Sequence, residues 1–177
     1  MKRKTYYLVN EVGDCGRNAL HWAIHINRID VVSFLLIKGA NPKVLTIDQY
    51  TPLQLAVLHH APDILEMLLG QHAVDVNQVT SHGTALHVAV RNEDVRCLQI
   101  LLKEDANIDI TDGFKNTPAD ICKDKEIGDI LSHRAEMGKL VIPNIAKGTV
   151  YKVSQTTKRL KERILQINPF KFEVSFS

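Results

Sequence analysis

One four-residue pattern recurs along the chain at a constant interval of 33 residues. Its copies are Asn18-Ala19-Leu20-His21, Thr51-Pro52-Leu53-Gln54, Thr84-Ala85-Leu86-His87 and Thr117-Pro118-Ala119-Asp120. A repeated unit this short cannot bury its apolar face alone, so neighbouring units must stack on one another. The period therefore predicts a repeat array, in which function lies on an extended surface instead of in an enclosed active site.

Each period contains two apolar stretches with helical spacing. In the first period, Leu20, Ala23 and Ile24 belong to a first short helix, and a second helix carries Val31, Val32, Leu35 and Leu36. The same pattern recurs in the next two periods, so each unit is expected to be a pair of amphipathic helices. Polar segments follow the second helix of each pair, and we expect these segments to project as fingers over residues 41–50, 75–83 and 107–116.

Local signals at the helix ends agree with this arrangement. Asp30, Asp63 and Asp94 are expected to lie immediately before the second helices, where a carboxylate caps free backbone amides and opposes the helix dipole. Gly39 follows a second helix, where a residue without a Cβ turns the chain out of the helix. The finger before Thr84 has one extra residue before Asp75 and one fewer after Asn77, so its tip is expected to differ.

These residues resemble the ankyrin repeat, whose signature T-P-L-H-x-A is matched from Thr84 to Ala89 and, with single departures, from Asn18 and from Thr51. The resemblance implies a mainly α solenoid of stacked helix pairs with hairpin fingers. It also implies that the signature histidines His21 and His87 form hydrogen bonds that hold adjacent units together. The match spans about three quarters of the chain.

Departures from the pattern suggest the domain boundaries. Residues 1–17 are interpreted as the remnant finger of a preceding repeat, and residues 18–134 as the repeats. The last repeat is expected to be a cap, because Asp120 replaces the signature histidine and its second helix, near 124–133, looks polar and abbreviated. Residues 135–146 are expected to form a linker, and residues 147–177 a basic extension that is incomplete and either β-rich or helical.

Composition favours a non-catalytic binding protein of the cytoplasm. The net charge of +2 argues against general nucleic-acid affinity, although residues 147–177 hold 7 basic and 2 acidic residues. Three cysteines without CxxC spacing and the absence of an apolar signal region indicate a reducing compartment. No stretch of roughly 20 apolar residues is present, which is the length that a membrane-spanning helix requires.

No phosphate-binding glycine loop or hydrolase motif occurs, so neither a cofactor nor an enzymatic activity is expected. The oligomeric state is left open.

The histidines and Cys97 each allow a chemical interpretation and a structural one. His21 and His25 lie four residues apart on one helix and His59, His60 and His72 follow one repeat later, which is geometrically compatible with zinc. No Cys or carboxylate completes a ligand set, so we favour no metal site. Cys97 could act as a nucleophile beside His87, but it lies on the apolar face of a second helix, where core packing explains it better.

The binding surface is expected on the concave face, formed by the exposed side of the first helices and by the finger tips. The residues at this position are Trp22, His25 and Ile26 in the first repeat, Leu58, His59 and His60 in the second, and Arg91 and Asn92 in the third. An aromatic side chain beside histidines and arginine is typical of a protein-binding hot spot. For Trp22, packing between repeats is an equal alternative.

Asn77 lies in a context, with Leu69, Asp75 and Val76, that resembles the sites ankyrin fingers offer to an asparaginyl hydroxylase. The alternative that we favour is an ordinary turn asparagine that bonds to the backbone of its finger.

The basic extension resembles the opening hairpin of a pleckstrin-homology domain. Residues 147–154 alternate like a strand and residues 161–167 could return as a second one. The phosphoinositide signature of that family falls on Lys152, Lys161 and Arg163, which would bracket an anionic head group at a membrane surface. Ankyrin repeats followed by such a domain also occur in oxysterol-binding-related proteins. The alternatives are a truncated domain without lipid binding and an amphipathic helix over residues 154–166.

Overall fold

The computed structural model of the protein describes residues 9–13, 16–139, 141–144 and 149–152. The chain divides into two compact parts, residues 1–128 and residues 129–177, which we describe separately. The first part contains the repeats, and we number them by their signature: repeat 1 from residue 18, repeat 2 from residue 51, repeat 3 from residue 84 and repeat 4 from residue 117.

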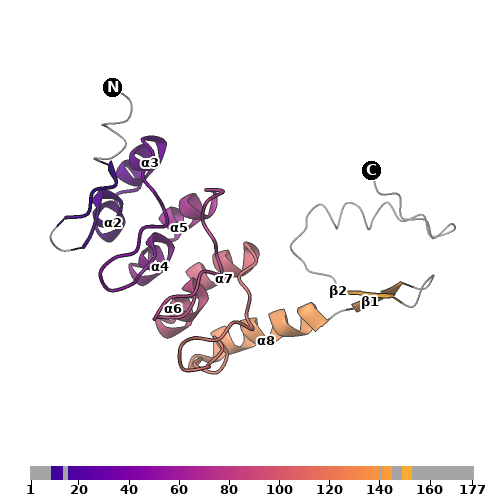
Figure 1. The fold of residues 1–177 in the computed structure, drawn as a ribbon. Helices are drawn as coiled ribbons and strands as arrows, with labels where there is room; N and C mark the ends of the chain where they lie inside the picture. Colours follow the sequence, from indigo (N-terminus) through magenta and orange to yellow (C-terminus); the bar gives the residue numbers. More distant parts are fainter. Residues whose placement is uncertain (1–8, 14–15, 140, 145–148, 153–177) are drawn as a thin grey trace. The chain divides into compact units, whose positions relative to one another are not determined.

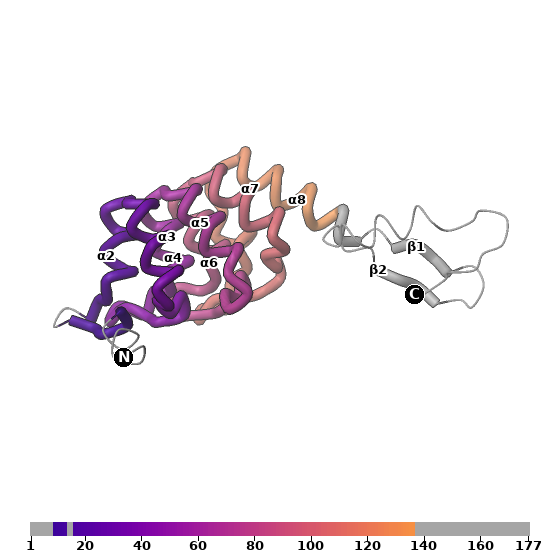
Figure 2. Tube along the Cα trace, turned by 90° about the horizontal axis from the view of Figure 1, so that it is seen from above, coloured from indigo at the N-terminus to yellow at the C-terminus, as the bar shows by residue number. Residues whose placement is uncertain are grey.

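The first part is built from helix pairs that stack in sequence order. The pairs are α2 (Ala19–His25) with α3 (Ile29–Ile37), α4 (Pro52–Leu58) with α5 (Pro62–Leu69), and α6 (Ala85–Arg91) with α7 (Val95–Lys103). The first helices α2, α4 and α6 contact one another in a row, and the second helices α3, α5 and α7 form a parallel row beside them (Figure 1, Figure 2). The expectation of a mainly helical solenoid of stacked pairs is confirmed.

Capping interactions explain where the first helices begin. The Asn18 side-chain oxygen accepts a hydrogen bond from the His21 backbone N–H at 3.0 Å, and Thr51 Oγ1 accepts one from the Gln54 N–H at 3.0 Å. In return, the His21 and Gln54 side chains accept hydrogen bonds from the backbone N–H of Asn18 and Thr51. Both free amides at each helix start are thereby satisfied, in the reciprocal arrangement of a capping box.

The predicted capping role of the second-helix aspartates is correct for only one of the three. Asp94 precedes α7 and accepts a hydrogen bond from the Cys97 N–H at 2.9 Å. Asp30 and Asp63 instead lie inside the first turns of α3 and α5, which begin one residue earlier. They retain the favourable interaction with the helix dipole but cap no amide.

The core lies between the two helix rows and continues from repeat to repeat. Leu20, Leu68, Leu86 and Leu101 are fully buried. Other fully buried large apolar residues of repeats 1–3 are Ile24, Leu55, Ile64, Leu65 and Leu98. Each unit therefore completes its core with leucine and isoleucine side chains of its neighbours, as a stacked array requires.

The fingers between the helix pairs end in tight turns, and the tip in repeat 2 differs from the other two. In repeats 1 and 3, the turn closes through Thr46 N–H to Tyr50 O and Asp112 N–H to Asn116 O. In repeat 2, Thr80 and Gly83 exchange two hydrogen bonds across a turn one residue shorter. Gly83 has a φ of +83°, and an added Cβ would lie 2.8 Å from Cγ of His87, so only glycine fits.

Repeat 4 departs from the prediction in both of its halves. Residues 118–121 form a turn instead of a first helix, with bonds from Asp120 N–H to Thr117 O and from Cys122 N–H to Ala119 O that are shorter-range than those of an α-helix. The second helix was expected to be abbreviated, but α8 (Lys125–Lys139) is longer than any helix of repeats 1–3. Asp124 starts it by accepting a hydrogen bond from the Ile127 N–H at 2.9 Å.

The second part contains the end of α8 and one antiparallel pair of strands. Strand β1 (Val141–Asn144) pairs with β2 (Thr149–Lys152), with Val141 opposite Lys152. The segment expected to be a linker, 135–146, thus holds the end of α8 and β1. Strand β2 lies within the strand expected over 147–154, whereas the expected return strand over 161–167 and the alternative helix over 154–166 lie outside the described residues. None of the described helices has the length and apolarity that crossing a membrane requires.

Candidate protein-binding surface

In repeats 1–3, the fourth residue of the signature ties the first helix to the finger that leads into the next repeat. His21 Nε2 lies 2.7 Å from the Val44 carbonyl oxygen, Gln54 Nε2 donates to Gly83 O at 2.8 Å, and His87 Nε2 lies 3.0 Å from Asn116 O. A histidine and a glutamine thus perform the same role. Each of these bonds holds a finger rigidly against the helix that precedes it.

The same bonds determine the protonation state of the two signature histidines. The backbone N–H groups of Asn18 and Thr84 donate to Nδ1 of His21 and His87, so each ring must carry its proton on Nε2 to donate to the finger carbonyl. Both rings are therefore neutral. Burial lowers the pKa of His21 and His87 below 6.5, which outweighs the opposite effect of the carbonyl acceptors.

Asp120 occupies the signature position of repeat 4 and ends this series. Its carboxylate accepts hydrogen bonds from the Thr117 N–H and Thr117 Oγ–H, both at 2.7 Å. A carboxylate has no N–H to donate to a further finger carbonyl. Replacement of His by Asp therefore keeps the local cap and loses the link to a following repeat.

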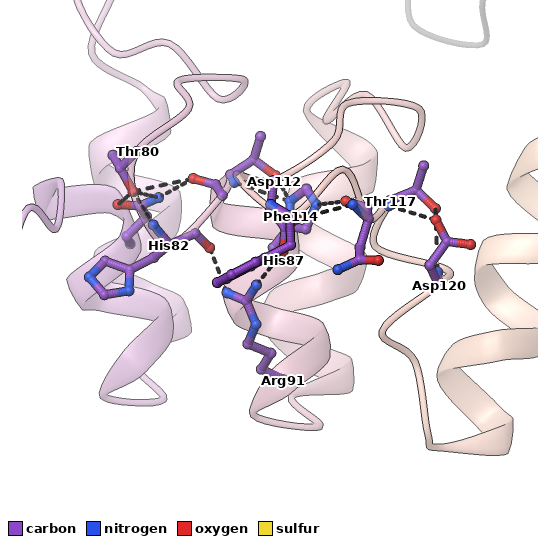
Figure 3. A network of polar contacts seen from close by, with 12 residues as sticks. Thr80, His82, His87, Arg91, Asp112, Phe114, Thr117 and Asp120 are labelled. Carbon is purple, nitrogen blue, oxygen red and sulfur yellow. Dashed lines mark hydrogen bonds and ion pairs between the residues drawn. The ribbon is translucent and has the colours of Figure 1, made fainter.

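A network of polar contacts runs from the finger of repeat 2 to the start of repeat 4 (Figure 3). The Tyr50 and His82 rings stack with their centroids 3.8 Å apart, and His82 Nε2 donates to Asp48 O at 2.8 Å. Arg91 then donates from Nη1 to His82 O at 2.6 Å and from Nη2 to Asp112 Oδ2 at 2.7 Å. Arg91, predicted as a binding residue, thus braces two successive fingers from α6.

Asp112 is the buried acceptor on which this network depends. Its side chain is 2% exposed, and its Oδ1 accepts hydrogen bonds from the Phe114 and Asn116 backbone N–H groups. Burial by itself raises the pKa of the Asp112 carboxyl, but these two amides, with His87 and Arg91 nearby, hold the pKa below its usual range. The carboxylate therefore stays charged and keeps the finger of repeat 3 in place.

The structure brings three of the predicted first-helix residues into contact. His25 Nδ1 lies 3.0 Å from His59 Nε2 across repeats 1 and 2, and the Trp22 ring meets the His25 ring edge-on at 5.7 Å. Burial, followed by the nearby His25 and Arg17, lowers the pKa of His59. Arg17 also lies over the Trp22 ring at 5.4 Å. These side chains form a continuous aromatic and histidine strip, which we call the first-helix surface.

The other predicted residues lie near this strip but have different roles. His60 is exposed, and its Nδ1 lies 2.7 Å from Asp94 Oδ2, so it links the inter-helix turn of repeat 2 to the cap of α7. Ile26 is exposed, whereas Leu58 and Asn92 are half-buried. The predicted set therefore includes both exposed and half-buried side chains.

The sequence-based prediction missed three apolar side chains on the fingers. Ile47, Val79 and Phe114 come from three successive fingers and are 68%, 52% and 81% exposed. Each is flanked on both sides by polar residues or glycine near the tip of its finger, and this is the signal that could have revealed them. Large apolar side chains held out by rigid fingers are suited to contact with another protein.

Neither nucleophilic nor metal chemistry is favoured by the described residues. Cys97 is fully buried, and burial raises the pKa of its thiol to about 12, so it does not form the reactive thiolate at neutral pH. His21 is engaged at both ring nitrogens. In the part of the chain that the structure describes, no three histidine, cysteine or acidic side chains lie together as a ligand set.

Asn77 connects two fingers instead of standing free. Its backbone N–H donates to Asp75 Oδ1 at 2.9 Å, and its side-chain oxygen accepts from the Asn107 N–H at 2.8 Å. Asn10 makes the equivalent bond, since its Oδ1 accepts from the Asn41 N–H at 2.7 Å. Hydroxylation of Asn77 stays a prediction, which mass spectrometry of the native protein would test.

The candidate lipid residues fall at the edge of the described chain. Lys152 is the last residue of β2, and Lys161 and Arg163 lie outside the described residues. The resemblance of the extension to a pleckstrin-homology domain stays a prediction.

Comparison with known proteins agrees with the repeat architecture. A family model described as ankyrin repeats (3 copies) matches residues 5–80 and 36–112. This chain belongs to the ankyrin-repeat family, whose repeats are general protein–protein interaction modules.

Similar proteins share the repeats and differ widely in size. Human transient receptor potential cation channel subfamily A member 1 is 36% identical over 100 residues, which cover 56% of this chain and 9% of that protein. Human B-cell lymphoma 3 protein is 37% identical over 97 residues, covering 52% of this chain and 21% of that protein. Human inversin is 33% identical over 107 residues, covering 59% and 10%. The chain thus spans less than a quarter of each of these relatives.

Proposed function

We propose that this chain is a non-catalytic interaction module or scaffold, which binds a partner protein on the first-helix surface and the adjoining finger tips. The observation that carries the proposal is the row of Ile47, Val79 and Phe114, exposed on three fingers that hydrogen bonds hold in place. A rigid surface loses little conformational entropy on binding, so exposed apolar groups on it favour affinity. A cytoplasmic location remains part of this proposal.

The chemistry of the surface indicates what a partner should present. The apolar finger tips require apolar side chains, and the Tyr50–His82 stack offers a flat ring face beside them. Arg91 is occupied by Asp112 and His82, so it serves mainly to position the fingers. The partner is therefore expected to insert apolar or aromatic side chains between successive fingers, with polar contacts at the histidine strip.

Affinity capture with the whole chain, followed by binding of each captured candidate in purified form, tests the proposal. Phe114→Ser and Ile47→Ser together should weaken binding at least tenfold, because they remove two exposed anchors without touching the core. Joint substitution of Trp22, His59 and Arg91 tests the first-helix surface in the same way.

The matched control is Ile37→Ser, which removes a side chain of similar exposure, 78%, from the second-helix row. It should leave binding within twofold of the unmodified chain. If the finger variant and this control bind a purified partner equally well, the finger tips are not the binding surface.

A phosphoinositide-directed role of the basic extension is the second candidate. It is favoured by one observation, that residues 149–152 form a strand ending at Lys152, as a pleckstrin-homology hairpin requires. Sedimentation with vesicles that contain or lack phosphoinositide is the test. Charge reversal at Lys161 and Arg163 should abolish co-sedimentation, and equal sedimentation with both kinds of vesicle would end this alternative.

A further inference from the structure

Two histidines of the first-helix surface share one hydrogen bond across the junction of repeats 1 and 2. His25 Nδ1 lies 3.0 Å from His59 Nε2, and the two ring planes are inclined at 78°. One proton lies between these nitrogens, so one ring donates and the other accepts. The outer nitrogens, His25 Nε2 and His59 Nδ1, take part in no hydrogen bond among the described residues. The pair is thus satisfied on its inner side and free to bind a ligand on its outer side.

The outer side of the pair is accessible. The counterparts of His25 are Leu58, which is half-buried, and Arg91, which is exposed although repeat 2 lies before it. This position therefore stays open within the array. In the part of the chain that the structure describes, the one buried side-chain polar atom without a partner is Asn18 Nδ2, so His59 Nδ1 reaches solvent.

Basic side chains of the following repeats already contact carboxylates. His60 Nδ1 lies 2.7 Å from Asp94 Oδ2, and Arg91 Nη2 lies 2.7 Å from Asp112 Oδ2. The ion pairs among the described residues include no contact between a carboxylate and either ring of the pair. The pair therefore lacks the negative partner that these neighbouring groups have.

The charged groups around the pair favour the binding of an anion. Burial is the main cause that lowers the pKa of His59, and the nearby His25, Arg17 and His60 lower it further. All three of these neighbours are bases, so none of them stabilises an added proton on the ring. A carboxylate against the outer nitrogens would stabilise that proton, because an opposite charge favours the protonated form.

Addition of one proton leaves the internal hydrogen bond of the pair intact. In the neutral pair, one proton lies between the rings and one lies on an outer nitrogen. An added proton occupies the other outer nitrogen, so both outer nitrogens become donors and the bond between the rings becomes charge-assisted. One further proton would put N–H groups on both facing nitrogens and break the bond. The singly charged pair is therefore the form suited to a carboxylate.

We propose that the His25–His59 pair is the anchor point for a carboxylate of the partner protein, an aspartate or glutamate side chain that the pair binds together with a proton. The inference rests on the proposed function, because it names the chemistry that the partner presents to the first-helix surface. Affinity rises as the pH falls, since proton uptake and carboxylate binding each favour the other. The carboxylate itself stays ionised above about pH 5.

Trp22 reports on this proton, because it is the single tryptophan of the chain and its ring meets that of His25 at 5.7 Å. An imidazolium beside an indole quenches its emission more than a neutral imidazole does. The whole chain is titrated from pH 7.5 to pH 5.5 with an acetylated, amidated tetraglutamate peptide, and with tetraglutamine as the matched control. The midpoint of quenching should rise by about 0.5 pH unit with tetraglutamate and stay in place with tetraglutamine.

The same coupling should be visible in the affinity. By reciprocity, a dye-labelled tetraglutamate should bind about threefold more tightly at pH 5.5 than at pH 7.5, as measured by fluorescence anisotropy. The double variant His25→Gln, His59→Gln should bind it equally at both pH values, since an amide forms the hydrogen bonds of a neutral imidazole and takes up no proton. The control His72→Gln, at an exposed histidine outside the pair, should keep the threefold ratio.

A permanent charge provides an independent test if the double variant unfolds. His25→Lys introduces a long basic side chain at the position that Arg91 occupies in repeat 3. This variant should bind tetraglutamate at pH 7.5 about as tightly as the unmodified chain does at pH 5.5. Circular dichroism at both pH values shows that each variant is folded.

Four outcomes would overturn the proposal: an unchanged quenching midpoint with tetraglutamate, an equal rise with tetraglutamine, a folded double variant that keeps the threefold ratio, or a folded His25→Lys variant that binds no more tightly at pH 7.5 than the unmodified chain. Failure of the finger-tip proposal is distinguishable. The Phe114→Ser, Ile47→Ser chain retains both histidines, so it should show the same rise with tetraglutamate whether or not it loses its partner.

Discussion

The side-chain amide of Gln54 donates a hydrogen bond to the Gly83 carbonyl at 2.8 Å, in the place where His21 and His87 use an imidazole Nε2. Glutamine and the neutral histidine tautomer each offer one acceptor to the cap and one donor to the finger. The chain thus contains, within itself, a replacement of this histidine that cannot be protonated near neutral pH.

The stability of the array should consequently depend on pH. The pKa values of His21 and His87 are lowered in the folded state, so the unfolded chain binds more protons below about pH 6.5 and stability falls as the pH falls through this region. The contribution of the two neutral rings to the stability of the fold should be fully present above pH 6.5. The double variant His21→Gln, His87→Gln should lose less of its thermal midpoint between pH 7.5 and pH 5.5. An equal loss in both proteins would contradict the role given to these rings.

The stacked core predicts large effects of single truncations. Leu68→Ala and Leu101→Ala should each cost about 2–5 kcal/mol in the free energy of unfolding, because both side chains are fully buried and leave a cavity. Val79→Ala, at an exposed finger position, should change it by no more than about 0.5 kcal/mol. Urea unfolding of the three variants gives the comparison. Similar values for all three would rule out a shared core at these leucines.

The buried Asp112 should matter more to stability than the Arg91 that pairs with it. Asp112→Ala leaves the Phe114 and Asn116 N–H groups and Arg91 without their acceptor, whereas Arg91→Ala leaves Asp112 with both amides. We expect the larger fall of the thermal midpoint for Asp112→Ala. The reverse order would mean that the guanidinium, not the carboxylate, organises the fingers.

The three second-helix aspartates allow a matched test of capping. Asp94→Ala should destabilise the fold by about 0.5–2 kcal/mol, since it removes the acceptor of the Cys97 N–H and the contact with His60. Asp63→Ala should cost less, because Asp63 is inside the first turn and has only an exposed ion pair with Arg96 at 3.6 Å. Chemical denaturation distinguishes the two, and equal costs would argue against the cap.

Cys97 should resist alkylation in the folded protein. Its thiol is fully buried and its pKa is about 12, so the thiolate fraction at pH 8 is very small. Iodoacetamide followed by peptide mass spectrometry should label Cys97 only after unfolding, and the unfolded protein serves as the positive control. Rapid labelling of the native protein would show that α7 opens readily.

The 33-residue period predicted the helix pairs and the leucine core correctly. The spacing of apolar residues within each period can be read directly from the sequence, and it fixes which face of each helix must be buried. It predicted the capping residues less well. Asp30 and Asp63 lie one residue inside their helices, within the first turn, since the exact start of a helix depends on backbone geometry at the preceding turn. The prediction of a short second helix near 124–133 was likewise wrong, because polar residues are compatible with helix and do not mark where α8 ends.

The sequence by itself determined that this protein is an array of stacked helix pairs, because the 33-residue repeat of apolar positions has no other way to bury its surface. Only the tertiary structure decided which side chains remain for contact with other molecules. Trp22 and Leu55 occupy equivalent positions, yet one is exposed and the other buried. Leu55 is buried where α4 packs against α2, so contact with a neighbouring helix and not the apolar character of the residue sets its exposure.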